Sequence, residues 1–170
     1  MCIRDRDNSV NKDLNIICFN LNQKIGNGQD PRLNLYWGAG YGVKSFFKLK
    51  TKDWVLVKEI KSNNKNILER VLFKHNSKPV YMLADAYNGQ WIKPCIEDFL
   101  KASNGSNSST IVCDSLKLNF SGGADLTAYV GHNGLMDFSV DLSFKKPPSK
   151  PKDVIVLGCY SREYFTPYIK

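Results

Sequence analysis

One histidine and one cysteine of this chain stand directly after short apolar runs, a placement that can support nucleophilic chemistry. His132 is one of only two histidines and follows residues 126–130, within the stretch GHNG. Cys159 follows residues 153–157, within the stretch GCYS. A cysteine attacks as the thiolate, and a nearby imidazole can take the thiol proton and later return it to a leaving amine. The pair predicts acyl transfer if the fold brings both residues together.

The elements expected around these residues alternate between strands and helices. Apolar runs rich in β-branched and aromatic residues predict strands at residues 14–21, 54–60, 80–87, 126–130, 138–144 and 154–158. Apolar residues at helical spacing predict helices at residues 34–49, 66–75 and 91–103. An exposed loop is expected at residues 103–110, and an edge strand or hairpin arm at residues 111–120. This alternation predicts an α/β fold, a three-layer sandwich with a mainly parallel sheet.

Several polar residues are expected at one rim of that sheet, because ligands and catalytic groups collect beyond the carboxyl ends of parallel strands. His132 and Cys159 should emerge there together. Asp85 and Asn88, in LADAYNG, should lie near the same rim and could bind a basic substrate side chain. Capping of the turn and of the following helix is the alternative that we favour for both. Asp137 is a comparable candidate with the same alternative.

The composition excludes several classes of function. The 170-residue chain is 42% hydrophobic, enough for one domain with a core, and its net charge is +8. The lysines are scattered, so a basic soluble surface is favoured over a nucleic-acid interface. Five cysteines without a C-x-x-C pair and two histidines predict neither a metal site nor a disulfide framework. No cofactor is expected, and no apolar run approaches the roughly 20 residues of a membrane span.

The order of the two motifs resembles the catalytic core of caspase-fold cysteine peptidases, the group that includes caspases, gingipains, legumains and separases. In that core one strand leads into Gly-His and a later strand leads into the cysteine, as residues 126–134 and 153–161 do here. More narrowly, GNGQDP, NLYWGAGYGVK, ADAYNG and YVGHNGLMDF are similar to an uncharacterised bacterial family. The family-level similarity covers most of residues 14–170.

The resemblance implies a cysteine endopeptidase that acts on a peptide or protein substrate. Cys159 would be the nucleophile and His132 the general base and acid. The amide of Cys159, with that of Gly134 or Asn133, would form the oxyanion hole. Two positions depart from the family pattern: Asn133 stands between the histidine and the glycine, and Gly158 replaces the alanine or aspartate common before the cysteine. The side chain of Asn133 could shift the oxyanion donor or crowd the substrate carbonyl.

Other functions remain open at this point. The chain could be a non-catalytic caspase-fold module that binds peptides or partner proteins at the same rim. A basic protein associated with nucleic acid or with the cell envelope is the weaker third hypothesis. A cysteine that ends an apolar strand is commonly a core residue, so Cys159 also has a purely structural interpretation. Cys18, Cys95 and Cys113 lie within apolar patterns and are expected in the core.

The two ends of the chain look artificial. Residues 1–6, MCIRDR, resemble the translated adapter of a sequencing library, so they are excluded from the fold prediction together with Cys2. Residues 162–170 begin an amphipathic helix and stop. We therefore expect a single caspase-like α/β domain over residues 7–170 that is incomplete at its C-terminus. The cellular location stays open, because a signal peptide could lie upstream.

Overall fold

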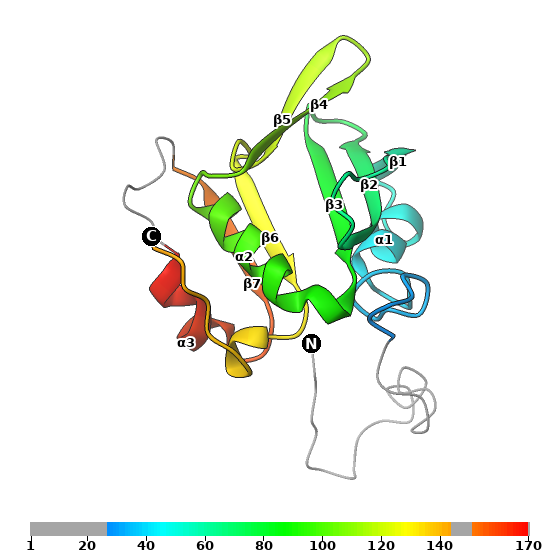
Figure 1. The fold of residues 1–170 in the computed structure, drawn as a ribbon. Coiled ribbons are helices and arrows are strands. Elements are labelled where there is room, and N and C mark those ends of the chain that lie inside the picture. Colours follow the sequence, from blue (N-terminus) through cyan, green and yellow to red (C-terminus); the bar gives the residue numbers. More distant parts are fainter. Residues whose placement is uncertain (1–26, 144–150, 170) are drawn as a thin grey trace. The chain divides into compact units, whose positions relative to one another are not determined.

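The computed structural model describes residues 27–143 and 151–169 (Figure 1). These residues form two compact units, an N-terminal unit that ends at Trp91 and a C-terminal unit that begins at Ile92. The single domain expected over residues 7–170 stays a prediction. The adapter-like N-terminus, the strand predicted at residues 14–21 and the core position predicted for Cys18 lie outside the described residues.

The N-terminal unit is built on an antiparallel sheet of three strands. β1 (Trp54–Glu59) pairs with β2 (Ile67–His75), and β2 also pairs with β3 (Tyr81–Tyr87). All three strands are rich in β-branched, aromatic or other apolar residues, which fit a pleated and partly buried surface. The order of the strands in the sheet follows their order in the chain, because short connections join antiparallel neighbours.

One face of this sheet carries the core of the N-terminal unit. Val71 and Phe73 of β2 lie two residues apart and therefore point to the same face. They form a buried cluster with Ala84 and Ala86 of β3 and with Trp37. Such a cluster excludes water from one side of the sheet, and burial of each large apolar side chain contributes about 1.5–3 kcal/mol to folding.

The helix predicted over residues 34–49 forms only at its C-terminal end. α1 spans Val43–Ser45 and continues into a π-helical turn, η1 (Phe46–Lys50), whereas residues 27–42 form consecutive turns. Gly40 has a φ angle of 55°, a left-handed conformation that glycine adopts at little cost and that a helix does not contain. The three glycines of this segment explain why the helical pattern does not become a continuous helix.

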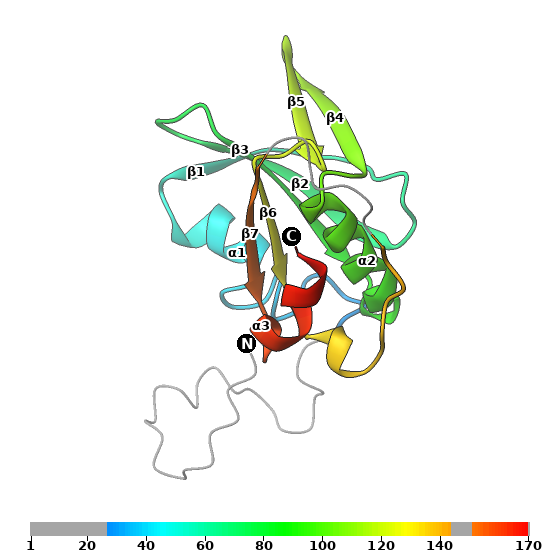
Figure 2. The ribbon, with the colours of Figure 1, turned by 90° about the vertical axis from the view of Figure 1, so that its left-hand side faces the viewer.

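The C-terminal unit combines one long helix with a hairpin and a parallel strand pair. Its elements are α2 (Ile92–Ser103), β4 (Ser108–Cys113), β5 (Leu116–Ser121), β6 (Leu126–Val130), the 3₁₀ turn η3 (Gly134–Met136), β7 (Asp153–Leu157), α3 (Ser161–Phe165) and the 3₁₀ turn η4 (Thr166–Tyr168). β4 and β5 form an antiparallel hairpin, whereas β6 and β7 pair in parallel. Figure 2 shows β6 and β7 side by side, with α3 at the end of β7.

Both α2 and α3 pack on one face of the β6–β7 pair. Ile96, Phe99 and Leu100 of α2 lie at helical spacing and enter a buried cluster with Tyr129 of β6 and Phe165 of α3. The three aromatic rings of this cluster contact one another, with ring centroids 5.5 to 5.9 Å apart. This packing holds the two helices against the strands and so positions the loops that follow β6 and β7.

The predicted sheet is wrong in strand direction. The chain does contain both helices and strands, but β1–β2–β3 and β4–β5 are antiparallel, and β6–β7 is the only parallel pair among the described residues. A mainly parallel caspase-like sheet is therefore not what these strands form. Parallel neighbours need a crossover of about a dozen residues or more, and the connections at residues 60–66 and 76–80 are too short for that.

Two element predictions are also wrong. Residues 66–75 were expected to form a helix, but they contain β2. Val71, Leu72 and Phe73 are consecutive and all buried, so the strand lacks the alternation that normally distinguishes it from a helix. Residues 138–143 form no strand, although Val140 is buried there.

The loop predicted at residues 103–110 is shorter than expected, because Ser103 still belongs to α2 and β4 begins at Ser108.

Most of the remaining elements are confirmed. Strands occupy most of the residues predicted for them at 54–60, 80–87, 126–130 and 154–158, and α2 covers the helix predicted at 91–103. Residues 111–120, predicted as one edge strand or hairpin arm, are instead divided by a turn between the end of β4 and the start of β5. Cys113 is buried, as expected of a core cysteine, and the partly buried Cys95 packs against the core of the C-terminal unit.

Candidate active site

The structure brings the two sequence motifs to the same end of the β6–β7 pair. Val130 lies opposite Leu157 at the end of the parallel register, and the amide of Gly131 donates a 3.1 Å hydrogen bond to the carbonyl oxygen of Leu157. His132 and Cys159 therefore each stand two residues beyond a paired strand residue. Carboxyl ends of neighbouring parallel strands are where α/β folds place reactive groups.

A buried asparagine joins the two loops. Asn133 is completely buried, and its side-chain Nδ2 donates a 2.8 Å hydrogen bond to the carbonyl oxygen of Cys159. Its Oδ1 accepts a 3.2 Å hydrogen bond from the amide of Leu135, so the same side chain also caps η3. The extra residue between histidine and glycine thus points into the protein and ties the cysteine loop to the histidine loop.

The backbone of His132 is held by two donors. The hydroxyl of Tyr129 donates to the carbonyl oxygen of His132 at 2.6 Å, and the amide of Gly134 donates to the same oxygen at 3.0 Å. The imidazole itself lies near the surface, with its Nε2 2.6 Å from Oδ2 of Asp137. Asp137, a candidate for substrate binding by sequence, is therefore the hydrogen-bonding partner of the histidine.

The cysteine loop contains a residue in an unfavourable backbone conformation. Tyr160 follows Cys159 directly and has φ 50° and ψ 27°, in the left-handed region that costs a non-glycine residue about 1–2 kcal/mol. This bend turns the chain from β7 into α3. On the other side of the cysteine, a Cβ added at Gly158 would lie 3.1 Å from the carbonyl oxygen of Gly131, so glycine permits the close approach of the two loops.

Gly134 has a structural role in the histidine loop. A Cβ at this position would lie 2.7 Å from two ring carbons of Phe138 and 3.1 Å from Cδ1 of Ile96. The Gly134 amide already donates to the carbonyl oxygen of His132. Of the two amides considered as the second oxyanion donor, that of Asn133 is consequently the better candidate.

Asp85 and Asn88 belong to the N-terminal unit and have partners there. Asp85 lies within β3 rather than beyond its end, and its two carboxylate oxygens accept hydrogen bonds of 2.6 and 2.7 Å from Nε and Nη2 of Arg70. Because of this bidentate pair, the pKa of Arg70 lies above its ordinary value. Asn88 accepts a hydrogen bond from the amide of Gln90 and so caps the 3₁₀ turn η2 (Gly89–Trp91). Asn88 therefore has the capping role predicted for it, whereas Asp85 forms an ion pair within the sheet.

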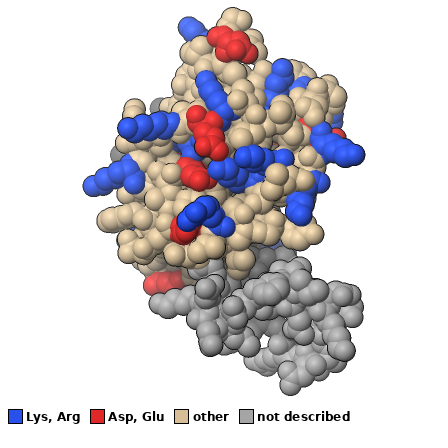
Figure 3. Space-filling view, turned by 90° about the vertical axis from the view of Figure 1, so that its right-hand side faces the viewer, with Lys and Arg blue, Asp and Glu red and all other residues tan. Residues whose placement is uncertain are grey.

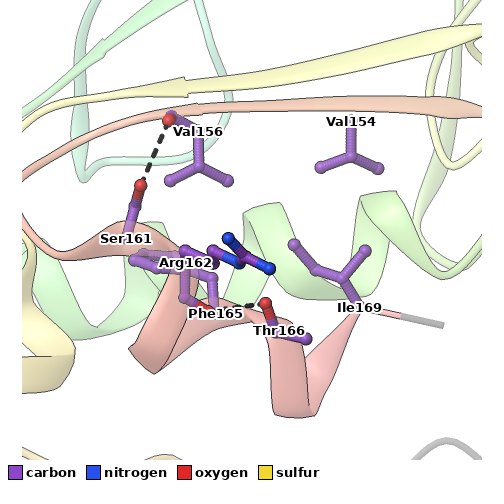
Figure 4. Close-up of a pocket in the computed structure, with 7 residues that line it drawn as sticks. All are labelled: Val154, Val156, Ser161, Arg162, Phe165, Thr166 and Ile169. Carbon is purple, nitrogen blue, oxygen red and sulfur yellow. Dashed lines mark hydrogen bonds between the residues drawn. The ribbon is translucent and has the colours of Figure 1, made fainter.

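A separate hollow of about 220 Å³ lies between β7 and the helical segment after it (Figure 4). Val154 and Val156 line it from the strand, and Arg162 and Ile169 point toward them from the other side. The remaining lining residues are Ser161, Phe165 and Thr166. Neither His132 nor Cys159 lines this hollow, so it is distinct from the site formed by the two motifs.

On the face that Figure 3 shows, the basic residues do not gather into one patch. Figure 3 shows Lys and Arg side chains spread over the face that carries β1, β2 and α1, with acidic side chains among them. Lys44, for example, pairs with Glu59 and Glu69 at 3.0 and 2.8 Å. Within residues 27–143 and 151–169 there is no group of three or more His, Cys, Asp or Glu side chains that could hold a metal ion. No helix in this part of the chain is long and apolar enough to cross a membrane.

Two residues of the site were missed by the sequence interpretation. Tyr129 was recognised as a strand residue, but its hydroxyl contact with His132 depends on how η3 folds back, which no local pattern encodes. Tyr160 gives no sequence signal at all, since tyrosine is not a residue typical of the left-handed region. The capping role of Asn133 could have been recognised, because an asparagine side chain in a turn commonly accepts a hydrogen bond from the backbone amide two residues later.

Comparison of the chain with protein-family models, with curated proteins and with solved structures gives no significant match in any of the three.

Proposed function

We propose that this chain is a cysteine endopeptidase in which Cys159 is the nucleophile and His132 is the general base and acid. The observation that carries this proposal is the parallel β6–β7 register, which ends at Val130 and Leu157 and releases the two motifs side by side. The hydrogen bond from Asn133 to the Cys159 carbonyl oxygen links the motifs directly. The proposed likeness to caspase-fold peptidases is restricted to β6, β7 and these motifs.

The proposed reaction proceeds through an acyl-enzyme. His132 accepts the thiol proton of Cys159, and the thiolate attacks the carbonyl carbon of the scissile peptide bond to form a tetrahedral intermediate. The C–N bond then breaks, and the leaving amine takes the proton from the imidazolium. A water molecule, deprotonated by His132, next attacks the thioester carbon and forms a second tetrahedral intermediate. Its C–S bond breaks to release the acid product, and the imidazolium returns its proton to the Cys159 thiolate.

Backbone amides would stabilise the negative charge on the oxygen of each tetrahedral intermediate. We assign this contact to the amides of Cys159 and Asn133. The side chain of Asn133 anchors its own loop through Leu135 and the cysteine loop through Cys159. Donors that are already fixed before the reaction need no reorganisation as charge develops, and loss of one such donor typically costs about 10²–10³ in kcat.

A non-catalytic module that binds peptides or partner proteins is the second candidate function. The observation in its favour is Asn133, the departure from the family pattern, whose buried side chain ties the two loops together whether or not the thiol reacts. In this alternative the same loops would form a recognition surface, and Cys159 would be a structural thiol. The two candidates differ in whether the imidazole affects the reactivity of the thiol.

The decisive measurement is the rate at which iodoacetamide alkylates Cys159 near neutral pH, followed by mass spectrometry of the peptide that contains it. We expect alkylation in the wild-type chain to be at least about tenfold faster than in His132→Ala, because the imidazole takes the thiol proton as the sulfur attacks. His75→Ala is the matched control and should leave the rate unchanged. Cys95, in the same unit, provides an internal reference for general accessibility.

Peptide hydrolysis provides the second readout. Incubation of wild-type protein with a mixed peptide library should give cleavage products that disappear in Cys159→Ala and in His132→Ala. Equal alkylation rates in wild type and His132→Ala, together with no cleavage of the library, would reject the peptidase and favour the binding module.

A further inference from the structure

An exposed carboxylate and the proposed catalytic imidazole contact each other at the surface of the C-terminal unit. Oδ2 of Asp137 lies 2.6 Å from Nε2 of His132, a short distance for a hydrogen bond that involves a carboxylate. We infer that Asp137 is a positioning residue that holds His132 in the tautomer protonated at Nε2, so that Nδ1 is the atom that receives the thiol proton of Cys159. The inference rests on the proposed function for its role in the reaction, but the tautomer can be tested independently.

The turn between the two residues holds their backbones in place. η3 is closed by hydrogen bonds from the amide of Met136 to the carbonyl oxygen of Asn133 and from the amide of Asp137 to that of Gly134. Asn133, Gly134 and Leu135 are buried, so this turn is packed against the unit rather than exposed. Since the His132 carbonyl is also held by Tyr129 and Gly134, both side chains start from fixed positions.

Stability does not explain this contact. The side chain of His132 is 54% exposed and that of Asp137 is 63% exposed. Exposed pairs of this kind contribute little to folding, typically about 0–1 kcal/mol, because water screens them and the side chains lose freedom. A short, well-placed contact with little stabilising value is more useful for orienting the ring than for holding the fold together.

The chemistry of the two groups sets the position of the proton. An ionised carboxylate only accepts hydrogen bonds, so the neutral imidazole must carry its hydrogen on the nitrogen that faces Asp137. That nitrogen is Nε2, and the lone pair is then on Nδ1. A proton acceptor needs such a lone pair, and a carboxylate behind the ring also stabilises the imidazolium formed when the thiol proton is taken. Asp137 would therefore select the atom through which His132 acts.

The tautomer can be read directly from the imidazole nitrogens by long-range ¹H–¹⁵N NMR on the full chain. Spectra would be recorded at alkaline pH, at the point where the imidazole ¹⁵N shifts no longer change as the pH is raised. Only two histidines contribute signals, and His132→Gln assigns them. His75 accepts a hydrogen bond at Nδ1 from the amide of Ser77, so it is an internal reference for the Nε2-protonated form.

We expect wild-type His132 to show the Nε2-protonated pattern, and Asp137→Ala, which removes the acceptor, to shift it to a mixture of the two tautomers. The His75 signals should not change. Asp141→Ala removes one exposed carboxylate from the same unit and is the matched control; circular dichroism verifies the folding of each variant. Cys159 alkylation should slow several-fold in Asp137→Ala, because a ring that carries its hydrogen on Nδ1 cannot accept the thiol proton there.

The possible results separate this inference from the proposed function. A wild-type tautomer pattern in Asp137→Ala, with slow alkylation in His132→Ala only, overturns the positioning role and leaves the peptidase intact. A tautomer shift in Asp137→Ala with alkylation that is indifferent to position 132 overturns the peptidase, and with it the role of Asp137 in a reaction. A tautomer shift together with slow alkylation in both variants supports both.

Discussion

The side-chain amide of Asn133 donates a hydrogen bond to the backbone carbonyl of Cys159 from a position that is closed to solvent. These two residues lie in the loops that follow β6 and β7, which are neighbouring strands of the C-terminal unit. A single buried side chain therefore joins the two loops that carry the proposed base and nucleophile. In a buried environment each of its hydrogen bonds is costly to lose.

Replacement of Asn133 should destabilise the C-terminal unit. Asn133→Asp keeps an acceptor for Leu135 but places a carboxylate oxygen against the carbonyl oxygen of Cys159, and Asn133→Ala removes both hydrogen bonds. We expect each variant to lower the free energy of unfolding by about 2–4 kcal/mol. Thermal unfolding followed by circular dichroism measures this. Asn107→Asp, at an exposed position, is the matched control, and equal melting temperatures for the variants at positions 133 and 107 would contradict the prediction.

The left-handed backbone conformation of Tyr160, directly after the cysteine, leads to a separate prediction. Glycine adopts the conformation of Tyr160 without strain, but it also makes the unfolded chain more flexible, so Tyr160→Gly should change stability by less than about 1 kcal/mol. Tyr160→Val should cost more, because a branched Cβ is disfavoured at positive φ. Chemical denaturation of both variants tests this order. Alkylation of Cys159 should be preserved in the glycine variant and altered in the valine variant; the reverse result would contradict the role assigned to the backbone.

Lys152 should be important for the stability of the C-terminal unit. Its Nζ donates to three backbone carbonyl oxygens, those of Ala102, Ser121 and Gly122, at 2.9 to 3.0 Å. Lys152→Met keeps most of the side-chain length and leaves these oxygens without that donor, so we expect a loss of about 2–3 kcal/mol. Hydrogen exchange over residues 92–143 should become faster in this variant. Lys117→Met, at an exposed position on β5, should change little, and a similar effect in both variants would argue against the prediction.

Glu69 should make the stability of the N-terminal unit depend on pH. Burial alone raises its pKa, but the hydrogen bonds from Lys44 and from Trp37 Nε1, at 2.8 and 2.6 Å, outweigh burial and hold the pKa below its ordinary value of 4.5. A carboxyl group with a lowered pKa stabilises the folded state above its ordinary pKa and loses that contribution as the pH falls through the lowered value. Glu69→Gln should therefore be less stable than wild type at neutral pH, by about 1–2 kcal/mol, with a difference that shrinks below pH 4.5.

Tryptophan fluorescence suits this measurement, because all three tryptophans of the chain, Trp37, Trp54 and Trp91, lie in the N-terminal unit. Urea unfolding at neutral and acidic pH would give the two free energies to compare. Glu163→Gln, at an exposed position in α3, is the control for loss of one negative charge. A difference between wild type and Glu69→Gln that is constant with pH would show that the ion pair does not titrate as described.

Elements in which apolar residues recur at a regular spacing could be predicted from the sequence, whereas elements shaped by tertiary contacts could not. α2 was recognised because Ile96, Phe99 and Leu100 recur at helical spacing and all enter one core. β2 was mistaken for a helix because Val71, Leu72 and Phe73 are buried in succession. The strand predicted at residues 138–144 is wrong for a different reason. Val140 is buried, but residues 138–143 are irregular and pair with no strand among the described residues.

In the candidate site, too, local sequence patterns predicted some features and tertiary contacts determined the others. The placement of His132 and Cys159 after neighbouring strands followed from two apolar runs and their glycines, and the parallel pairing of β6 and β7 agrees with it. The role of Asp137 did not follow, because the sequence shows only that it lies near His132, and the 3₁₀ turn η3 decides which atoms meet. The partner of Asp85 was hidden for a similar reason, since Arg70 is its neighbour only through the register of β2 and β3.

Because β6 and β7 pair in parallel, the distance between the two loops does not depend on the length of the chain that connects the strands. Ladder hydrogen bonds and the contact between Gly131 and Leu157 set the distance between the histidine and cysteine loops at their own bases. Substitutions that weaken the pairing of β6 with β7 would therefore change the separation of the two loops, even where neither loop is itself altered.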